Sequence, residues 1–194
     1  INDTTLSSLD WSSTYLSINF SERLIGRIEY TNNILVVCSD KGTVLVNITD
    51  LTNPTVYSEI PVSSRDAHIV NNYLYVTTFG KLEIYDISDP TNPVEVSSID
   101  IYKSDPLVVD ASGNYAYVGN DTALVVVNVT DKAAPVIEGL WTLGAGISGV
   151  DLYGDHVMVI DYHDGIYSVD VSVKTAPVEV DNVTGFDAND VRIL

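Results

Sequence analysis

Hydrophobic and polar residues alternate along most of the chain with a period of two, and no segment sustains the helical period of 3.6 residues. Runs such as Tyr73–Val76 are rich in β-branched and aromatic residues and have the length of single strands. Short polar segments such as Ser39–Gly42 separate neighbouring runs and suit hairpin turns. In one representative unit the pattern predicts four strands, at Ala67–Val70, Tyr73–Thr77, Leu82–Tyr85 and Val94–Ile99.

This unit occurs four times, at intervals of about 40 residues, beginning at Asn32, Asn71, Gly113 and Gly154. Equivalent positions agree in type in three columns: Val37, Val76, Val118 and Val159; Asn47, Asp86, Asn128 and Asp170; and Pro54, Pro93, Pro135 and Pro177. Because proline cannot donate to a strand ladder, the third column marks the start of the outermost strand. Four antiparallel strands in about 40 residues are typical of a propeller blade. The sequence therefore predicts an all-β protein, a β-propeller of about four four-stranded blades.

Several segments resemble a known family. Lys81–Asp86 resembles the LVIVD repeat, and Asp86–Val94 is similar to the DVSDPxNPV tail of that family. Ser112–Val118 is similar to its SGNYAYV segment. The resemblance covers roughly residues 27–194 and is weaker in the first and fourth units, where for example Val173 replaces the expected Asp. It implies propeller blades of secreted or surface-anchored proteins and is not tied to one enzymatic activity.

Both ends of the chain also resemble parts of blades. Thr4–Trp11 is similar to an outer strand, and Asp190–Leu194 is similar to the first strand of a unit. We therefore expect residues 1–26 to hold the outer strand of a preceding blade and a long connection. The four blades are expected at about 27–65, 66–106, 107–148 and 149–189, followed by the first strand of a further blade at 190–194. This arrangement favours part of a larger propeller, with closure by another subunit and a four-bladed ring as alternatives.

The charge of the chain excludes some classes of partner. The net charge is −18, with only nine Lys and Arg among 194 residues. No basic cluster is available to hold a phosphate backbone, which argues against nucleic acid, and the same deficit argues against anionic lipid. No apolar run approaches the roughly 18 residues of a membrane span. The single cysteine, Cys38, follows an apolar run and is expected in the core.

The clearest chemical signal is a set of N-glycosylation sequons, in which Ser or Thr follows Asn by two residues without an intervening Pro. Asn19 in the long connection and Asn120 near a hairpin tip are the preferred acceptors. Asn47 and Asn128 share a column with Asp, so their short side chains can instead bond the backbone and shape a turn. The full set is Asn2, Asn19, Asn47, Asn120, Asn128 and Asn182. Together the sequons favour an extracellular glycoprotein with N-linked glycans.

Two groups of residues are candidates for binding or catalysis. Propellers usually hold ligands in the central channel, which is lined by the inner strands. The equivalent positions of those strands are Glu29, His68, Asp110, Asp151 and Arg192. Paired carboxylates there would suit acid–base chemistry, although we favour polar residues that face channel water.

The second group is Asp161–Gly165, where the carboxylates of Asp161 and Asp164 suit Ca²⁺. The same residues suit a hairpin turn in which Asp-Gly supplies the positive φ angle, and we favour the turn. No other cofactor is expected.

The sequence contains no Gly-x-Ser-x-Gly elbow and no phosphate loop. We therefore expect a non-enzymatic extracellular surface glycoprotein module, structural or adhesive, such as a component of a cell-surface layer or filament. Its expected partners are other copies or surface proteins. The low content of Lys and the abundance of Ser, Thr, Asn, Val and Tyr resemble archaeal surface glycoproteins. The alternatives are a ligand- or carbohydrate-binding or hydrolytic propeller with a site at the channel, and a protein-interaction scaffold.

Overall fold

The computed structural model describes residues 25–101, 106–188 and 191, and these residues contain β-strands and no α-helix. None of this part of the chain therefore provides a helix able to cross a membrane. The strands form four antiparallel sheets, and in each sheet every strand pairs with the next strand of the chain. We call the sheets blades 1 to 4.

The strands of blade 1 are β1 (Ile25–Thr31), β2 (Ile34–Ser39), β3 (Thr43–Asn47) and β4 (Thr55–Ile60). Those of blade 2 are β5 (Asp66–Val70), β6 (Tyr73–Thr78), β7 (Lys81–Asp86) and β8 (Val94–Asp100). Those of blade 3 are β9 (Pro106–Ser112), β10 (Tyr115–Asn120), β11 (Ala123–Asn128) and β12 (Val136–Thr142). Those of blade 4 are β13 (Ile147–Tyr153), β14 (His156–Asp161), β15 (Gly165–Asp170) and β16 (Val178–Thr184).

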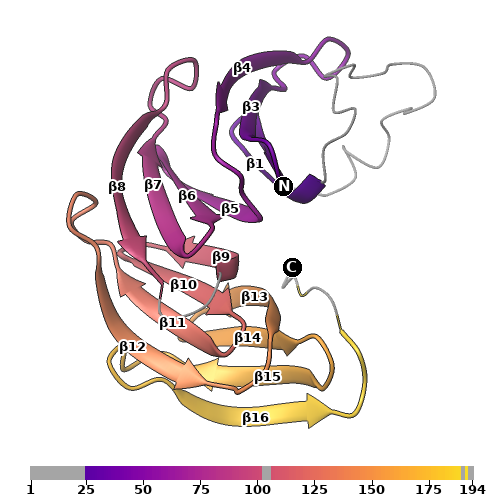
Figure 1. The fold of residues 1–194 in the computed structure, drawn as a ribbon, viewed down its shortest axis with the longest axis vertical. Helices are drawn as coiled ribbons and strands as arrows, with labels where there is room; N and C mark the ends of the chain where they lie inside the picture. The colour runs from indigo at the N-terminus through magenta and orange to yellow at the C-terminus, as the bar shows by residue number, and fades with distance from the viewer. Residues whose placement is uncertain (1–24, 102–105, 189–190, 192–194) are drawn as a thin grey trace.

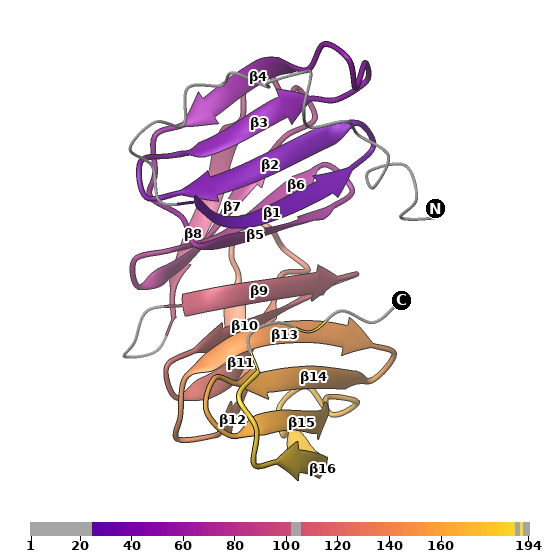
Figure 2. The same cartoon turned by 90° about the vertical axis from the view of Figure 1, so that its right-hand side faces the viewer.

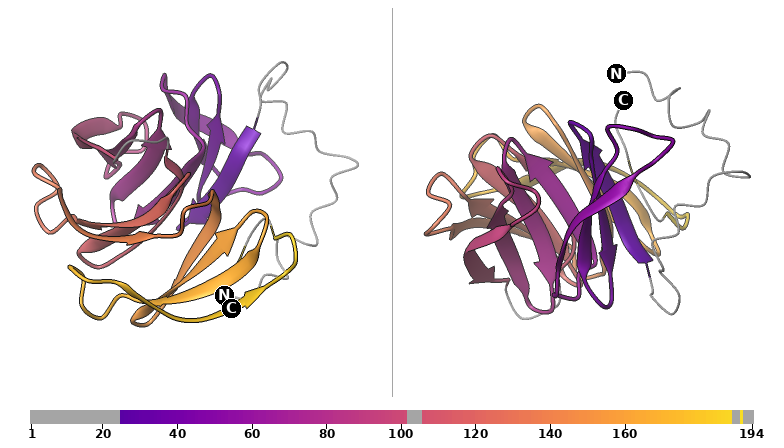
Figure 3. Two further views of the ribbon diagram at one scale, coloured as in Figure 1. Left: turned by 60° about the horizontal axis from the view of Figure 1, so that its bottom comes forward. Right: turned by 90° about the horizontal axis from the view of Figure 1, so that it is seen from above.

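The blades follow one another around a common centre (Figure 1). The first strand of each blade, namely β1, β5, β9 or β13, lies nearest this centre, and the fourth strand lies at the outer rim. The sheets are twisted, as Figures 2 and 3 show from the side and from above. This arrangement is that of propeller blades, and it confirms the all-β class that the alternation of residues predicts.

The positions of the strands follow the predicted pattern closely. In blade 2 the predicted strands coincide with β5 to β8, with each end shifted by at most one residue. Each residue of the proline column directly precedes the outer strand of its blade, as expected for a residue that cannot donate to the ladder. Two predicted blade boundaries differ slightly, because β1 begins at Ile25 and β9 begins at Pro106. The predictions for residues 1–24, 189–190 and 192–194 lie outside the described residues.

The turn between the first two strands explains why each unit begins with Asn or Gly. Asn71, Gly113 and Gly154 have φ angles of 55°, 58° and 61°, which lie in the left-handed region. Glycine adopts this region without steric cost, and Asn tolerates it better than most residues. The same turn in blade 1 uses Asn32 and Asn33, with φ angles of 45° and 66°.

Three hydrophobic clusters lie between consecutive blades. In the first cluster, Leu45 of blade 1 packs with Leu74 of blade 2. In the second, Ile84 of blade 2 packs with Val125 of blade 3, and in the third, Leu124 of blade 3 packs with residues of blade 4. Each of these five side chains has no exposed surface, and burying such a side chain contributes about 1.5–3 kcal/mol. The core of the protein is therefore divided among the joints between blades.

Cys38 belongs to the first of these clusters and is 1% exposed, which confirms its expected place in the core. Burial in these apolar surroundings raises the pKa of its thiol to about 12.

The outer strands of blades 1 to 3 each place a small residue against a loop of the following blade. The hydroxyls of Ser58 and Ser97 donate to the carbonyl oxygens of Pro90 and Lys132 in the next blade, at 2.7 and 2.5 Å. The equivalent residue of blade 3 is Gly139, where a Cβ atom would lie 2.0 Å from a carbonyl oxygen of blade 4. A small residue is required here because the loop of the next blade approaches the strand closely.

Candidate functional site

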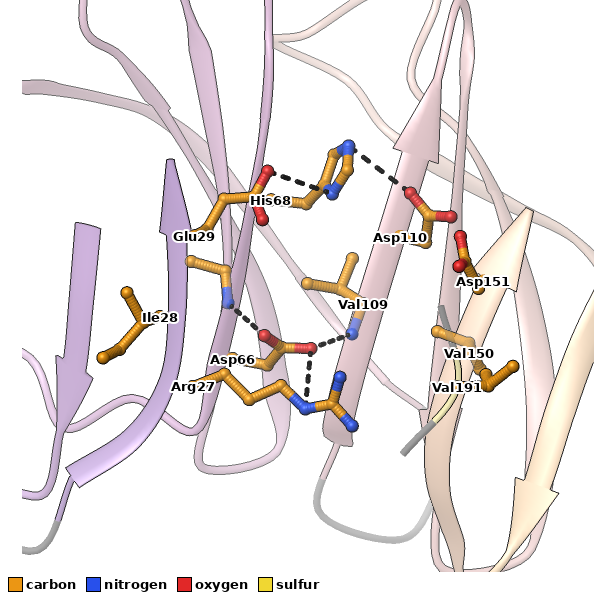
Figure 4. A pocket seen from close by; sticks show the side chains of 11 residues that line it. Arg27, Ile28, Glu29, Asp66, His68, Val109, Asp110, Val150, Asp151 and Val191 are labelled. Carbon is orange, nitrogen blue, oxygen red and sulfur yellow. Dashed lines mark hydrogen bonds and ion pairs between the residues drawn. The ribbon is translucent and has the colours of Figure 1, made fainter. Parts of the chain in front are cut away.

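The centre of the blades holds a pocket of about 250 Å³ (Figure 4). Four of the five residues that the sequence predicts to line the channel meet in it. These are Glu29 on β1, His68 on β5, Asp110 on β9 and Asp151 on β13, and each occupies the same register in its blade. The fifth, Arg192, lies outside the described residues. The pocket therefore brings together at least one titratable side chain from every blade.

His68 lies between two carboxylates that belong to other blades. Its Nδ1 atom is 3.7 Å from Glu29 Oε1, and its Nε2 atom is 3.4 Å from Asp110 Oδ1. When the imidazole carries a proton on both nitrogens, these contacts become ion pairs that join blade 2 to blades 1 and 3. The three side chains are each only partly exposed, so water screens this attraction incompletely.

Sequence reasoning missed a deeper carboxylate, Asp66, at the start of β5. It is 5% exposed, and its Oδ1 atom accepts a hydrogen bond from the amide of Ala67 at 2.9 Å. Its Oδ2 atom accepts a hydrogen bond from the amide of Val109, in blade 3, at 3.0 Å. Removal from water raises the pKa of Asp66 from 3.8 to about 6, and the lowering effects of the Arg27 charge and the two amides do not offset it.

Arg27 of blade 1 also points into the centre and was not predicted. Its Nε atom lies 3.8 Å from Asp66 Oδ2, and its Nη2 atom donates to the carbonyl oxygen of Ser148, in blade 4, at 2.7 Å. Arg27 and Asp66 occupy equivalent positions, where blades 3 and 4 have Val108 and Gly149. The signal that could have identified them is a pair of charges in a column that is otherwise small or apolar.

Asp110 binds backbone amides in the same way as Asp66. Its Oδ1 atom accepts from the amide of Ala111, the next residue of its own strand, at 2.6 Å. Its Oδ2 atom accepts from the amide of Leu152, in blade 4, at 2.6 Å. Two carboxylates of the centre therefore connect their own strand to the inner strand of the next blade, and each such charge-assisted bond is worth about 1.5–3 kcal/mol.

The predicted Ca²⁺ loop and the predicted glycan acceptor Asn120 occupy a single structural column. Ser39, Thr78, Asn120 and Asp161 stand at the end of the second strand of each blade, and all four are buried. Their side chains serve the hairpin that follows. The Oδ1 atom of Asn120 accepts from the amides of Thr122 and Ala123 at 2.9 and 2.8 Å, and Asp161 Oδ1 accepts from the amide of His163 at 2.8 Å. This polar column, two residues after the valine column, is visible in the sequence and is the signal that marks these positions as part of the turn.

The burial of Asn120 disfavours it as a glycan acceptor in the folded protein. With no exposed surface, its side chain has no room for a glycan. Asp161 is 3% exposed, and Asp164 accepts a hydrogen bond from the hydroxyl of Tyr167 at 3.0 Å. Across residues 25–101 and 106–188, no three His, Cys, Asp or Glu side chains form a group that could hold a metal ion.

The remaining sequons fall in different settings. The Oδ1 atoms of Asn47 and Asn128 each accept from the amide two residues later at 2.9 Å, and Asp86 and Asp170 do the same at 2.8 and 2.7 Å. This column therefore shapes a turn, as the exchange between Asn and Asp suggests. Hydrogen bonds from the following Ser also lower the pKa values of Asp86 and Asp170.

The amide nitrogens of two sequon residues are also engaged. Asn128 Nδ2 donates to Glu138 at 2.6 Å, and the exposed Asn182 Nδ2 donates to Glu179 at 2.7 Å. Asn2 and Asn19 lie outside the described residues.

Four-stranded twisted sheets set around a polar centre define the class of protein as a β-propeller module. Residues 63–101, 108–142 and 147–185 match the family model of the LVIVD repeat. The chain belongs to the LVIVD repeat family.

The fold is also similar to solved structures. A crystal structure of the computationally designed Ika8 protein matches 88% of this chain with a TM-score of 0.70 and 11% sequence identity. The match covers 52% of the designed chain, so this chain spans about half the length of that protein. At this identity the likeness concerns the fold alone. No curated protein sequence gives a significant match.

Proposed function

We propose that this chain is a non-enzymatic structural or adhesive module of an extracellular surface glycoprotein. The observation that supports this function best is that the central carboxylates accept hydrogen bonds from backbone amides of two blades. Asp66 and Asp110 each hold one amide of their own strand and one amide of the next blade. A general acid or base must exchange a proton with a substrate, whereas these carboxylates are committed as acceptors that join blades.

The outer surface suits an extracellular setting. A net charge of −18 keeps the surface hydrated and discourages non-specific association. Asn182 lies on β16, where every residue is exposed, so a glycan there would project from the outer rim of blade 4. Asn47 is the partly exposed last residue of β3, and its side chain binds the turn that follows through its oxygen in the hydrogen bond described above. These two residues and the sequon at Asn19 are the acceptors that we propose.

Mass spectrometry of the protein purified from its source tests this function. We expect glycopeptides that contain Asn182 and Asn47, and an unmodified peptide that contains Asn120. Asn120 is the matched control because it has the same sequon but a buried side chain. Unmodified Asn19, Asn47 and Asn182 in a cytosolic fraction would contradict the proposal.

A second candidate is a ligand-binding propeller, which the pocket at the centre favours. Glu29, Asp110 and Asp151 give it an acidic lining, so a polyhydroxylated or cationic small molecule suits it best. A glycan array with Glu29→Gln and with Asn182→Gln separates the two functions. Binding that Glu29→Gln abolishes and Asn182→Gln retains would favour a carbohydrate ligand of the channel, and an array without binding would contradict such a ligand.

A further inference from the structure

One contact network at the centre includes all four blades, and we call it the four-blade hub. It consists of Arg27 of blade 1, Asp66 of blade 2, the amide of Val109 in blade 3 and the carbonyl of Ser148 in blade 4 (Figure 4 shows the first three). The Oδ2 atom of Asp66 accepts from blade 3 at 3.0 Å and faces the Arg27 guanidinium, which in turn donates to blade 4 at 2.7 Å. A change in the charge of Asp66 therefore acts directly on the contacts of blade 2 with blades 1 and 3, and through Arg27 on the contact between blades 1 and 4.

The ionised form of Asp66 is poorly compensated in this position. Burial removes most of its hydration, and the two amides provide only two of the hydrogen bonds that a carboxylate accepts in water. At 3.8 Å the Arg27 Nε atom is too distant for a hydrogen bond and contributes only a Coulombic attraction. Asp66 therefore prefers either a proton or access to water.

We propose that the four-blade hub closes more tightly at acidic pH. Protonation of Asp66 favours the closed arrangement of the inner strands, and ionisation of Asp66 favours an arrangement in which water enters between blades 2 and 3. The direction follows from linkage. The arrangement that keeps Asp66 away from water binds a proton more strongly than a hydrated one, so acidification favours closure. This device concerns the joint between blades and is independent of the proposed surface function.

The other charged groups around Asp66 come from each neighbouring strand. β1 provides Arg27 and Glu29, β5 provides His68, and β9 and β13 provide Asp110 and Asp151. Cys38, on β2, stays neutral over the relevant range because burial raises its pKa to about 12. Among these residue types, histidine is the one that ordinarily changes charge between pH 5 and 8, so the test must separate His68 from Asp66.

Amide hydrogen exchange of the full chain tests the proposal, with protection factors corrected for the intrinsic effect of pH. The amide of Val109 is the reporter, because it donates to Asp66. If hydrated Asp66 has the ordinary pKa of 3.8 and the closed hub a pKa of about 6, the protection factor of Val109 rises about tenfold from pH 8 to pH 5. The amide of Leu152, which donates to Asp110, is the internal control and is expected to change less.

Two variants identify the responsible group. In Asp66→Asn the pH dependence at Val109 should disappear, and in His68→Gln it should remain. Carbon-13 titration of the Asp66 carboxyl group in the unaltered protein gives a readout that requires no variant, with an expected midpoint near 6. A midpoint near 4, a protection factor of Val109 that does not change with pH, or a change that persists in Asp66→Asn would each overturn the proposal.

Discussion

Replacing Tyr75 with Phe should stabilise the protein, although it removes a polar atom from a natural core. Tyr75 lies on β6 in the cluster between blades 2 and 3, and its side chain has no exposed surface. Its hydroxyl is buried and has no hydrogen-bond partner in the described part of the chain. Burial accordingly raises the pKa of this hydroxyl to about 12. The equivalent residues of blades 1 and 4, Val36 and Met158, carry no hydroxyl.

The magnitude follows from the cost of a buried, unpaired polar group. Leaving such a group without a partner costs about 1–3 kcal/mol, and Tyr75→Phe removes this cost while it keeps the ring that fills the joint. The loss of one oxygen atom leaves a very small void, which returns part of the gain. We expect an increase of about 1 kcal/mol in the free energy of unfolding, and a rise in Tm of about 2–4 °C for a chain of this size.

Tyr85→Phe is the matched control, because the ring is similarly buried but the hydroxyl is paired. The hydroxyl of Tyr85 donates to Glu83 Oε2 at 2.6 Å, and the side chain is 6% exposed. Losing a hydrogen bond to a carboxylate should lower the free energy of unfolding by about 1.5–3 kcal/mol. Urea denaturation followed by circular dichroism measures both variants. Equal destabilisation by the two substitutions would refute the reasoning, because it would mean that the hydroxyl of Tyr75 also has a partner.

Gly139→Ala should lower the free energy of unfolding by about 1–3 kcal/mol in urea denaturation, because the new Cβ atom would collide with a carbonyl oxygen of blade 4. Gly146→Ala is the control: its Cβ atom would have no other atom within 4 Å, so the free energy of unfolding should change by less than about 1 kcal/mol. Because the pKa of Asp66 is raised from 3.8 to about 6, the folded protein binds more protons than the unfolded chain between these two pH values. From pH 8 to pH 5 the free energy of unfolding of the unaltered protein should therefore rise by about 1.4 kcal/mol relative to that of Asp66→Asn in the same assay. Cys38 should react with a thiol reagent only upon unfolding, as absorbance would show, because it is buried and its pKa is about 12. Asn47→Asp should preserve stability and Asn47→Ala should cost about 1 kcal/mol, because only Asp retains the acceptor for the turn amide; equal losses in thermal melts would contradict this.

The strands and the channel positions could be predicted because both depend on periods within the chain. Alternation assigns residues to the two faces of each sheet, and the repeat then places Glu29, His68, Asp110 and Asp151 at one register. Four such residues in equivalent blades must meet wherever the first strands surround a common centre. The repeat alone is therefore enough to predict that these four residues line the centre.

The joints between blades could not be predicted in the same way, because they depend on which atoms of one blade approach the next. Asp66 and Arg27 are the two charged residues of a column that has Val108 and Gly149 in the other blades. The partners of Asp66 are an amide of blade 3 and the Arg27 guanidinium of blade 1, and the pattern within one blade indicates neither. The sequon alone suggests that Asn120 is an exposed glycan acceptor. The other three members of its column are also polar, and in the structure all four are buried. Positions at which the repeats agree in residue type thus indicate structure that all blades share. Positions at which one blade has a charged residue and others do not indicate contacts between blades, which only the three-dimensional structure shows.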